Sequence, residues 1–211
     1  MKKRKVVDIQ VQKRRKNRRN IYLDDGSVFG VSEDVFISIP IHIGDTISDQ
    51  VFNDILESDS KSKIYNSAIS LLSYRMRSKS ELKDRLIRKN YNEDSIMDVI
   101  NNLELKGYLD DEKFAYAFAK EKVKNKLIGP AALKFEMSSH KLDLELIDRT
   151  INSIYDMFPQ KMIINRLITK WKVKDSIGKD PKIKSKIINR LKNKGFYWDD
   201  IQSAINAFDY N

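Results

Sequence analysis

Residues 82–103 read LKDRLIRKNYNEDSIMDVINNL, and the spacing of their apolar side chains decides the fold. The apolar positions follow one another in steps of four, five, five, four and three: Leu82, Leu86, Tyr91, Ile96, Ile100 and Leu103. Steps of three and four place side chains on one face of an α-helix. The first step of five crosses a turn, and the second matches a hydrophobic staple around a helix cap at Asn92. The stretch therefore predicts two amphipathic helices joined by a turn.

The same six positions recur twice further along the chain. Residues 133–154, LKFEMSSHKLDLELIDRTINSI, and residues 187–208, IINRLKNKGFYWDDIQSAINAF, carry apolar side chains in identical steps. Asp143 stands at the cap of the second copy, and Tyr197, a poor cap, stands at the cap of the third. One spacing in three copies indicates a repeated structural unit.

One more apolar stripe precedes each pair of helices, near Ile64, Phe114 and Ile163. Boundary signals agree with this division: Ser78 and Glu81 form a capping box, and the sequence Gly129-Pro130 starts a helix. Gly107 and Gly195 stand where helices end. We therefore predict three tandem three-helix repeats, at residues 61–109, 110–158 and 159–211, that form an elongated array.

Residues 1–60 have a different pattern. Val7, Ile9 and Val11 alternate with polar residues, which is typical of a half-buried strand, and Asp25-Gly26 between two apolar runs predicts a hairpin. We expect a small antiparallel ribbon of two or three strands, followed by short helices near residues 32–38 and 48–58. The predicted fold class is mainly α: three tandem three-helix repeats, preceded by a small β-hairpin or ribbon extension with short helices.

Composition excludes several kinds of site. The 211 residues contain no cysteine, so disulfides and thiolate chemistry are impossible, and the two histidines, His42 and His140, stand far apart. No phosphate-binding-loop motif, apolar signal segment or run of about 20 apolar residues occurs. We expect a soluble, cytoplasmic, non-enzymatic monomer that has no cofactor, no metal and no membrane partner.

The net charge of +10 is concentrated at two places. Residues 1–20 hold ten basic residues and one acidic residue, and residues 160–195 hold twelve and two. This pattern favours contact with a polyanion, although the first run could be a charged strand edge and the second an ordinary solvated helix face. The candidate nucleic-acid or filament contacts are Lys13, Arg14, Arg15, Lys16, Arg18, Arg19, Arg75, Arg77, Lys172, Lys174, Lys182, Lys184 and Lys186.

The segment Gly107-Tyr108-Leu109-Asp110-Asp111-Glu112-Lys113-Phe114-Ala115 resembles the G-Y-L-D-D-x-x-F-A signature of the RecX family, regulators of the bacterial recombinase RecA. The segment Ser78-Lys79-Ser80-Glu81-Leu82 is similar to that family's S-x-x-E-L helix entry. The resemblance covers residues 61–158. The sequence departs from the family pattern in two turns, where Asn90-Tyr91 and Ser138-Ser139-His140-Lys141 replace Lys-Gly turns.

The resemblance implies a structural signature made by Gly107, Tyr108, Leu109, Asp110, Asp111, Phe114 and Ala115. It also implies a regulator that binds RecA, as a filament on single-stranded DNA and in free form. Such a regulator lodges in the filament groove and inhibits ATP hydrolysis, strand exchange and co-protease activity. Basic ends add weak, non-specific binding to single- and double-stranded DNA.

Two other functions compete with this interpretation. The helix–turn–helix-like units could bind DNA without a recombinase. Asp110 and Asp111 could instead hold Mg²⁺ in a nuclease, but their place before a helix favours capping of free N–H groups.

Overall fold

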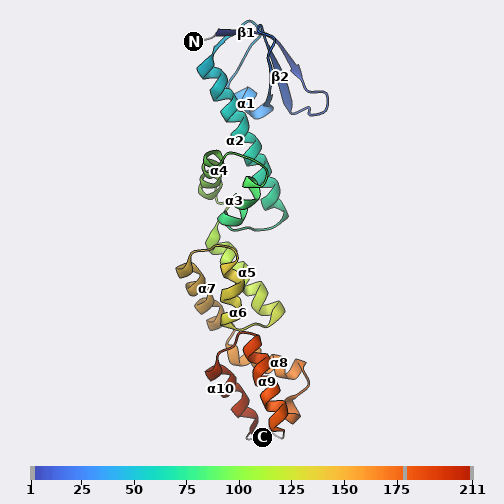
Figure 1. Cartoon of the computed structure of the whole chain (residues 1–211), viewed down its shortest axis with the longest axis vertical. Helices are drawn as coiled ribbons and strands as arrows, with labels where there is room; N and C mark the ends of the chain where they lie inside the picture. The colour runs from blue at the N-terminus through green and yellow to red at the C-terminus, as the bar shows by residue number, and fades with distance from the viewer. Residues whose placement is uncertain (1–2, 178–179, 210–211) are drawn as a thin grey trace. The chain divides into compact units, whose positions relative to one another are not determined.

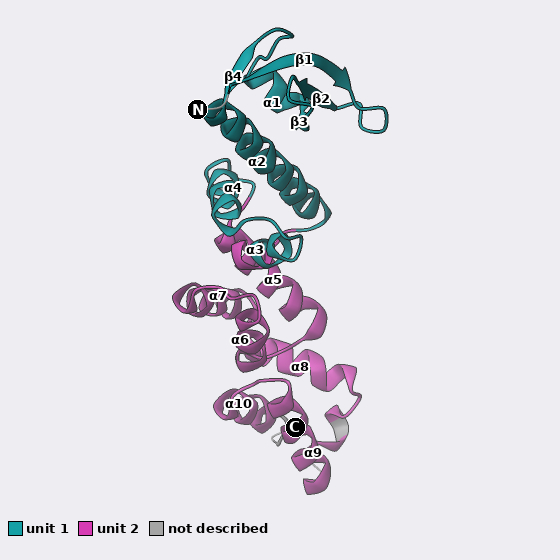
Figure 2. Cartoon of the chain, turned by 45° about the horizontal axis from the view of Figure 1, so that its top comes forward, with its two compact units in different colours: residues 1–75, 82–108 teal, residues 76–81, 109–211 magenta. Residues whose placement is uncertain are grey.

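The computed structural model describes residues 3–177 and 180–209. It confirms the predicted fold class, because a small antiparallel sheet is followed by a chain that is mainly helical (Figure 1). The described chain forms two compact units, coloured separately in Figure 2. The first contains the chain up to Arg75 together with Leu82–Tyr108, and the second contains Met76–Glu81 and the chain from Leu109 onward.

The sheet has four strands in the order β3-β2-β1-β4, and each neighbouring pair is antiparallel. Its elements, with the short helix that follows the third strand, are β1 (Lys3–Val11), β2 (Arg18–Leu23), β3 (Val28–Ser32), β4 (Thr46–Ser48) and α1 (Glu33–Ser38). The Asp25-Gly26 turn joins β2 to β3 as predicted, with Gly26 at a φ of 81°. Strand β4 was not predicted, because three residues are too few to show an alternating pattern.

Helix α2 (Asp49–Tyr74) is one continuous helix of 26 residues. The predicted short helix near 48–58 is therefore wrong in its extent. Residues 57–62, Glu-Ser-Asp-Ser-Lys-Ser, are polar but contain neither proline nor glycine, so nothing breaks the helix there. The buried residues Ile55, Asp59, Ile64 and Ala68 lie along one face and connect the sheet core to the first repeat.

Three helices form each repeat. After α2 come α3 (Lys79–Ile87) and α4 (Glu93–Leu105), then α5 (Asp111–Lys126), α6 (Pro130–Ser138) and α7 (Leu144–Met157). The third repeat contains α8 (Gln160–Lys170), the 3₁₀ turn η1 (Lys174–Ser176), α9 (Pro181–Asn193) and α10 (Trp198–Asp209). The repeated apolar positions are buried except for Tyr91, which is half-buried, and Phe208, whose side chain lies outside the described residues.

The predicted helix caps are present. Ser78 Oγ accepts the Glu81 N–H at 3.1 Å, Asn92 Oδ1 accepts the Ser95 N–H at 3.1 Å, and Asp143 caps α7. Each repeat also has a residue in the left-handed conformation just before the third of its six apolar positions. These residues are Asn90, Lys141 and Gly195, with φ values of 60°, 52° and 84°. The two departures from the family's Lys-Gly turns thus fall on positions that glycine occupies most easily.

The second unit has a single core that runs through both of its repeats, from Phe114 to Ile205. Helix ends connect these repeats directly. The N–H groups of Gly129 and Ala131, at the start of α6, donate to the carbonyls of Lys194 and Gly195, just beyond α9, at 2.8 and 3.1 Å. The N–H groups at the start of a helix and the carbonyls at its end have no partner within that helix. Here the N–H groups at the start of α6 bind the carbonyls at the end of α9.

This joint leaves no room for a side chain at Gly195. A Cβ there would lie 2.3 Å from the Ala132 nitrogen, and the φ of 84° already disfavours any other residue. We expect Gly195→Ala to lower the free energy of unfolding by at least ~2 kcal/mol, since a steric clash adds to left-handed strain of about 1–2 kcal/mol. Gly26→Ala is the matched control, because Gly26 has a φ of 81° with open space around it. Equal losses for the two variants, measured by thermal unfolding, would contradict the close approach.

Candidate nucleic-acid interface

The most basic exposed segment is the loop between β1 and β2. Lys13, Arg14, Arg15 and Lys16 all lie exposed in it. Two backbone hydrogen bonds close the loop: the Gln12 N–H donates to the Arg18 carbonyl and the Arg18 N–H donates to the Arg15 carbonyl, both at 2.9 Å. Four adjacent cations are therefore presented on a defined turn, which is a suitable arrangement for contacting phosphates.

Arg18, predicted as a contact residue, has a structural partner. Its guanidinium donates to both carboxylate oxygens of Asp59 on α2, at 3.0 and 2.9 Å, and to the Gly30 carbonyl at 2.7 Å. Asp59 is only 2% exposed and also accepts the Ser32 N–H at 2.8 Å. Burial raises the pKa of Asp59, but the hydrogen bonds from Arg18, Lys63 and the Ser32 N–H outweigh it, so the pKa lies below its ordinary value. Arg18 joins the sheet to α2.

Arg19 is paired in a similar way. It donates to both oxygens of Glu33, at 3.0 and 2.6 Å, and its guanidinium lies 4.6 Å from the centre of the Phe36 ring. The basic run of the sequence is thus divided in the structure. Lys13–Lys16 project from the loop, whereas Arg18 and Arg19 attach β2 to neighbouring helices.

The predicted pair at the end of α2 is also split. Arg75 is exposed at the C-cap of α2, whereas Arg77 is only 6% exposed and forms an ion pair with Glu81. Glu81 Oε2 lies 4.0 Å from Nδ1 of His140, and the His140 ring packs edge-on against Phe118. Arg77 therefore belongs to the packed segment at the start of α3.

In the third repeat, Lys172, Lys174, Lys182 and Lys186 are exposed and Lys184 is half-buried. Lys172 follows the C-cap of α8 with a φ of 56°, and Lys174 begins η1. The other three lie on α9, whose N-terminus is capped by Asp180. These residues come from two adjoining segments of the second unit.

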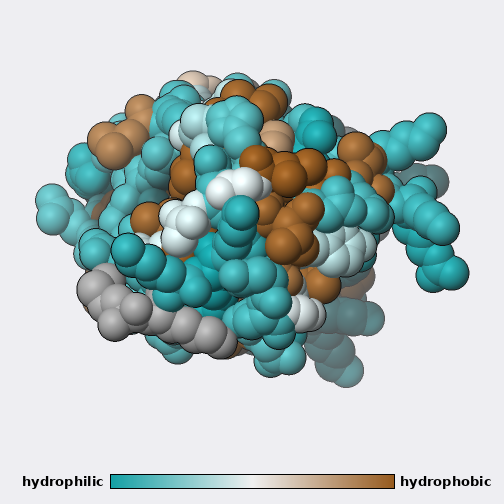
Figure 3. All heavy atoms as spheres, turned by 90° about the horizontal axis from the view of Figure 1, so that it is seen from above, coloured by the Kyte–Doolittle hydropathy of each residue, from teal (hydrophilic) through white to brown (hydrophobic). Residues whose placement is uncertain are grey.

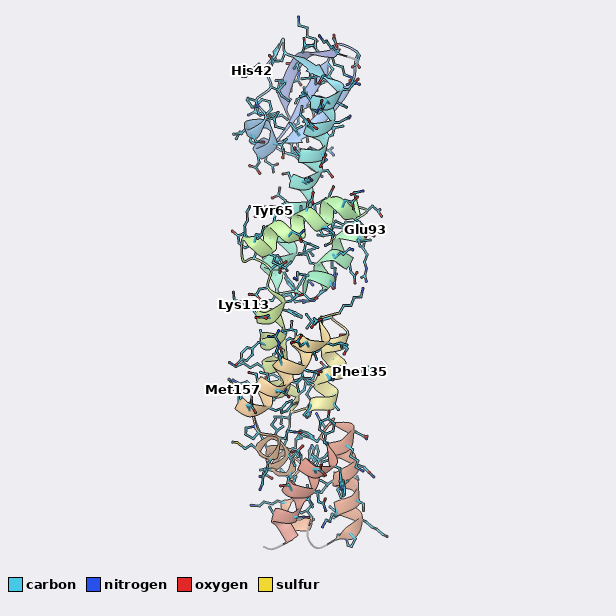
Figure 4. All side chains as sticks on the ribbon, turned by 90° about the vertical axis from the view of Figure 1, so that its left-hand side faces the viewer. His42, Tyr65, Glu93, Lys113, Phe135 and Met157 are labelled. Atoms are coloured by element: carbon cyan, nitrogen blue, oxygen red, sulfur yellow. The ribbon has the colours of Figure 1, made fainter. Side chains whose placement is uncertain are left out.

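The signature residues serve the fold. Gly107 has a φ of 72°, and Asp110 Oδ1 caps α5 by accepting the Lys113 N–H at 2.9 Å. This hydrogen bond is the largest cause of the lowered pKa of Asp110, whose carboxylate also pairs with the Lys113 ammonium at 3.1 Å. Figure 4 labels Lys113. Asp111 accepts the Lys79 N–H at 2.8 Å. Leu109, Phe114 and Ala115 are buried, and Tyr108 is 59% exposed.

An open cavity of about 450 Å³ lies beside α2 and α4 in the first unit. Its lining includes Lys61, which forms ion pairs with Glu57 and Asp98, both at 2.8 Å. It also includes Tyr65, labelled in Figure 4, whose ring centre lies 5.0 Å from the Lys106 ammonium. The hydrogen bond to Asp98 is the main cause of the raised pKa of Lys61. The opposite charges of Lys61, Glu57 and Asp98 are therefore matched within the first unit.

Within the described ranges, no three His, Asp or Glu side chains gather closely enough to hold a metal ion. No helix there is both long enough and apolar enough to cross a bilayer.

Figure 3 shows one face of the molecule, where hydrophilic side chains surround a group of exposed hydrophobic ones. Phe135 on α6, 82% exposed, is one apolar side chain that projects from the helices (Figure 4).

The candidate residues identified from sequence omitted Arg190 and Lys194. Both stand near the end of α9, one helical turn apart, and Arg190 covers the ring of Trp171. The sequence does place these two cations four residues apart, a spacing that makes them neighbours on one face of a helix. Their proximity to Trp171 and to α5, however, depends on contacts between separate helices.

These features define a class of protein: a tandem three-helix-repeat protein with an N-terminal sheet and exposed basic segments. Two family models match the chain. The model described as the regulatory protein RecX N-terminal domain matches residues 4–48, and the one described as RecX, first three-helix domain, matches residues 65–103.

Relatives extend the match to nearly the whole chain. The regulatory protein RecX of Bacillus subtilis is 30% identical over 97% of this chain and 77% of its own length. That of Oceanobacillus iheyensis is 30% identical over 98% of this chain and 77% of its own length. The chain belongs to the RecX family of regulatory proteins.

Solved structures agree on the fold. A crystal structure of a regulatory protein RecX superposes with a TM-score of 0.75 and 24% identity, covering 97% of this chain and 99% of that one. RecX from Lactobacillus salivarius gives a TM-score of 0.62 and 26% identity over 73% of this chain and 99% of its own. The sheet and the helical repeats are therefore family features.

We expect Arg18→Gln to lower the free energy of unfolding by about 3–5 kcal/mol, because it leaves the buried Asp59 carboxylate without its bidentate partner. Arg14→Gln, in the exposed loop, should change it by less than about 0.5 kcal/mol. Denaturant unfolding of the two variants measures the difference. A loss of similar size for both would show that Arg18 is no more structural than its neighbours in the loop.

The lowered pKa of Asp59 predicts a pH dependence of stability. The carboxylate binds its proton more readily in the unfolded chain, where its pKa is about 4. Its contribution is therefore fully present above that pH and is lost as the pH falls through the lower native value. Unfolding followed from neutral to acid pH should show this loss, and Asp59→Asn should flatten that part of the profile. An unchanged profile would exclude Asp59 as its source.

Proposed function

We propose that this protein is a non-enzymatic regulator that binds a RecA-type recombinase, both free and as a filament on single-stranded DNA. It occupies the filament groove and inhibits ATP hydrolysis, strand exchange and co-protease activity. The observation that carries this proposal is the match, over nearly the full chain, to relatives named regulatory protein RecX. Repair and recombination of DNA are the processes that it regulates.

The arrangement of charge supports a contact with DNA. The β1–β2 loop presents four exposed cations, and the third repeat presents Lys172, Lys174, Lys182 and Lys186. Cations on a surface attract the phosphate backbone without reading its sequence. Arg18, Arg19 and Arg77 contribute indirectly, because they fix the elements that carry the exposed residues.

The packing of the repeats supports inhibition by restraint. In the second unit, one core and the paired ends of α6 and α9 join two repeats into a single body. A body of this kind that contacts adjacent recombinase subunits opposes the movements between them that turnover requires. Inhibition then needs no catalytic group in this chain.

The test is the DNA-dependent ATPase of the recombinase, measured with and without this protein. We expect suppression by the wild-type chain. The fourfold variant Lys13→Gln, Arg14→Gln, Arg15→Gln and Lys16→Gln should suppress less and show a weaker salt dependence. For single-stranded DNA, the slope of log affinity against log salt falls by roughly 0.7 for each phosphate that the protein no longer neutralises.

A control variant removes the same charge elsewhere in the chain: Arg85→Gln, Arg88→Gln, Lys89→Gln and Lys113→Gln. It should retain more suppression than the loop variant. No suppression by the wild-type protein would exclude the recombinase proposal. Tight binding to one duplex sequence, about a thousandfold above unrelated duplexes, would instead identify a DNA-binding protein that acts without a recombinase.

A further inference from the structure

A compact group of cations lies where the second and third repeats meet. Trp171, the C-cap of α8, has the Arg190 guanidinium 4.0 Å from its ring centre. Lys194 follows Arg190 by one turn of α9 and donates from its Nζ to the Lys126 carbonyl, at the end of α5, at 2.8 Å. Lys170 directly precedes Trp171. The ends of three helices therefore bring four cations together.

The cations act on one another. The pKa of Lys194 is lowered, first by burial and then by the positive charges of Lys170, Arg190 and Lys126. Lys126 has a counter-ion, because its ammonium lies 2.8 Å from Glu136. Among the side chains that the structure describes, no carboxylate lies within ion-pair distance of Lys170, Arg190 or Lys194. The repulsion among Lys170, Arg190 and Lys194 is thus not compensated by any acidic side chain that the structure describes.

Helix dipoles balance only part of this charge. Lys170 and Arg190 lie in the last turns of α8 and α9, and the ammonium of Lys194 meets the C-terminal end of α5, where cations are ordinarily favourable. Each helix end supplies about half a negative charge. Three such ends offset about half of the charge of three cations, so a net positive potential remains.

We propose that Lys170, Arg190 and Lys194 form a phosphate-binding site at the joint between the second and third repeats. Its ligand is the backbone phosphate of a polynucleotide. A planar guanidinium presents two parallel N–H donors to phosphate oxygens, and stacking on Trp171 holds that plane in one orientation. Lys170 and Lys194 add two further positive charges near this guanidinium. This inference deepens the proposed function by locating a DNA contact outside the β1–β2 loop.

The surroundings favour a polymer over a small anion. Lys172 and Lys174 continue the chain directly after Trp171 and are exposed. On α9, between Arg190 and Lys194 in the sequence, the exposed Lys192 has its ammonium 4.9 Å from the Trp198 ring centre. These further exposed cations, close in sequence to Trp171 and Arg190, suit a ligand with several phosphates in a row. Free polyphosphate shares this chemistry and is the alternative source that the experiment separates.

The experiment measures binding to a labelled oligothymidylate over a range of salt concentrations, with no recombinase present. The double variant Lys170→Gln, Arg190→Gln should bind at least several-fold more weakly at low salt. Its slope of log affinity against log salt should fall by roughly 0.7 for each of the two substituted cations. The control, Lys120→Gln with Lys161→Gln, removes the same charge from the same unit and should retain most of the affinity. Equal losses for both double variants would overturn the site, as would wild-type binding by the Lys170/Arg190 variant.

Inorganic tripolyphosphate distinguishes the two ligand sources. If the polynucleotide is the ligand, tripolyphosphate should compete only at much higher concentration of phosphate groups. Competition at equal phosphate concentration would overturn the polymer assignment. Because the recombinase is absent, failure here leaves the ATPase test standing, and failure of the ATPase test leaves this site standing.

Trp171 supplies a readout at the site itself. The chain has two tryptophans, so Trp198→Phe leaves Trp171 as the sole indole emitter. Oligothymidylate should change the emission of this variant, and adding Lys170→Gln should reduce the change together with the affinity. This arm needs no substitution of Arg190, so it holds even if Arg190→Gln impairs folding. An emission that stays constant at saturating oligothymidylate would overturn the proposal.

Discussion

The pairing of one helix start with another helix end holds the second unit together. Free N–H groups at the start of α6 meet free carbonyls beyond α9, and each set would otherwise need water or a side-chain cap. The backbones approach closely only because neither Gly129 nor Gly195 has a Cβ, which at Gly129 would lie 2.4 Å from the Gly195 carbonyl oxygen. The continuous core then forms around a joint with fixed geometry. The basic group at Arg190 and Lys194 exists because this joint brings the ends of α5, α8 and α9 together.

A buried ion pair has the corresponding role in the first unit. Arg18 and Asp59 connect the sheet to the middle of α2, and α2 continues into the first repeat. Such a pair contributes little net stability compared with apolar packing, but it is costly to break and specifies one arrangement. It also divides the basic run of the sequence into two parts. The cations of the loop remain exposed, whereas the first arginines of β2 are committed to the fold.

Local patterns predicted much of this structure. The spacing of six apolar residues identified all three repeats, because a helix buries every third or fourth side chain whatever its neighbours are. The caps at Ser78, Asn92, Asp110 and Asp143 followed from residue type alone. The extent of α2 and the strand β4 did not follow. A polar stretch without glycine or proline is ambiguous locally, and a three-residue strand is defined only by its partner. The elongation of the array remains a prediction.

The sequence by itself determined the helical class, the three copies, the positions of most helix ends and the two places where positive charge gathers. These properties depend on neighbours within about one or two helical turns. Only the tertiary structure decided which cations remain exposed, because Arg18 and Arg19 find their carboxylate partners, Asp59 and Glu33, on other elements of the fold. It also decided that Arg190, Lys194 and Trp171 lie together. A cation is available to a ligand only if it is not already paired with an acidic side chain of the fold. In this protein, these pairs form between segments far apart in the chain.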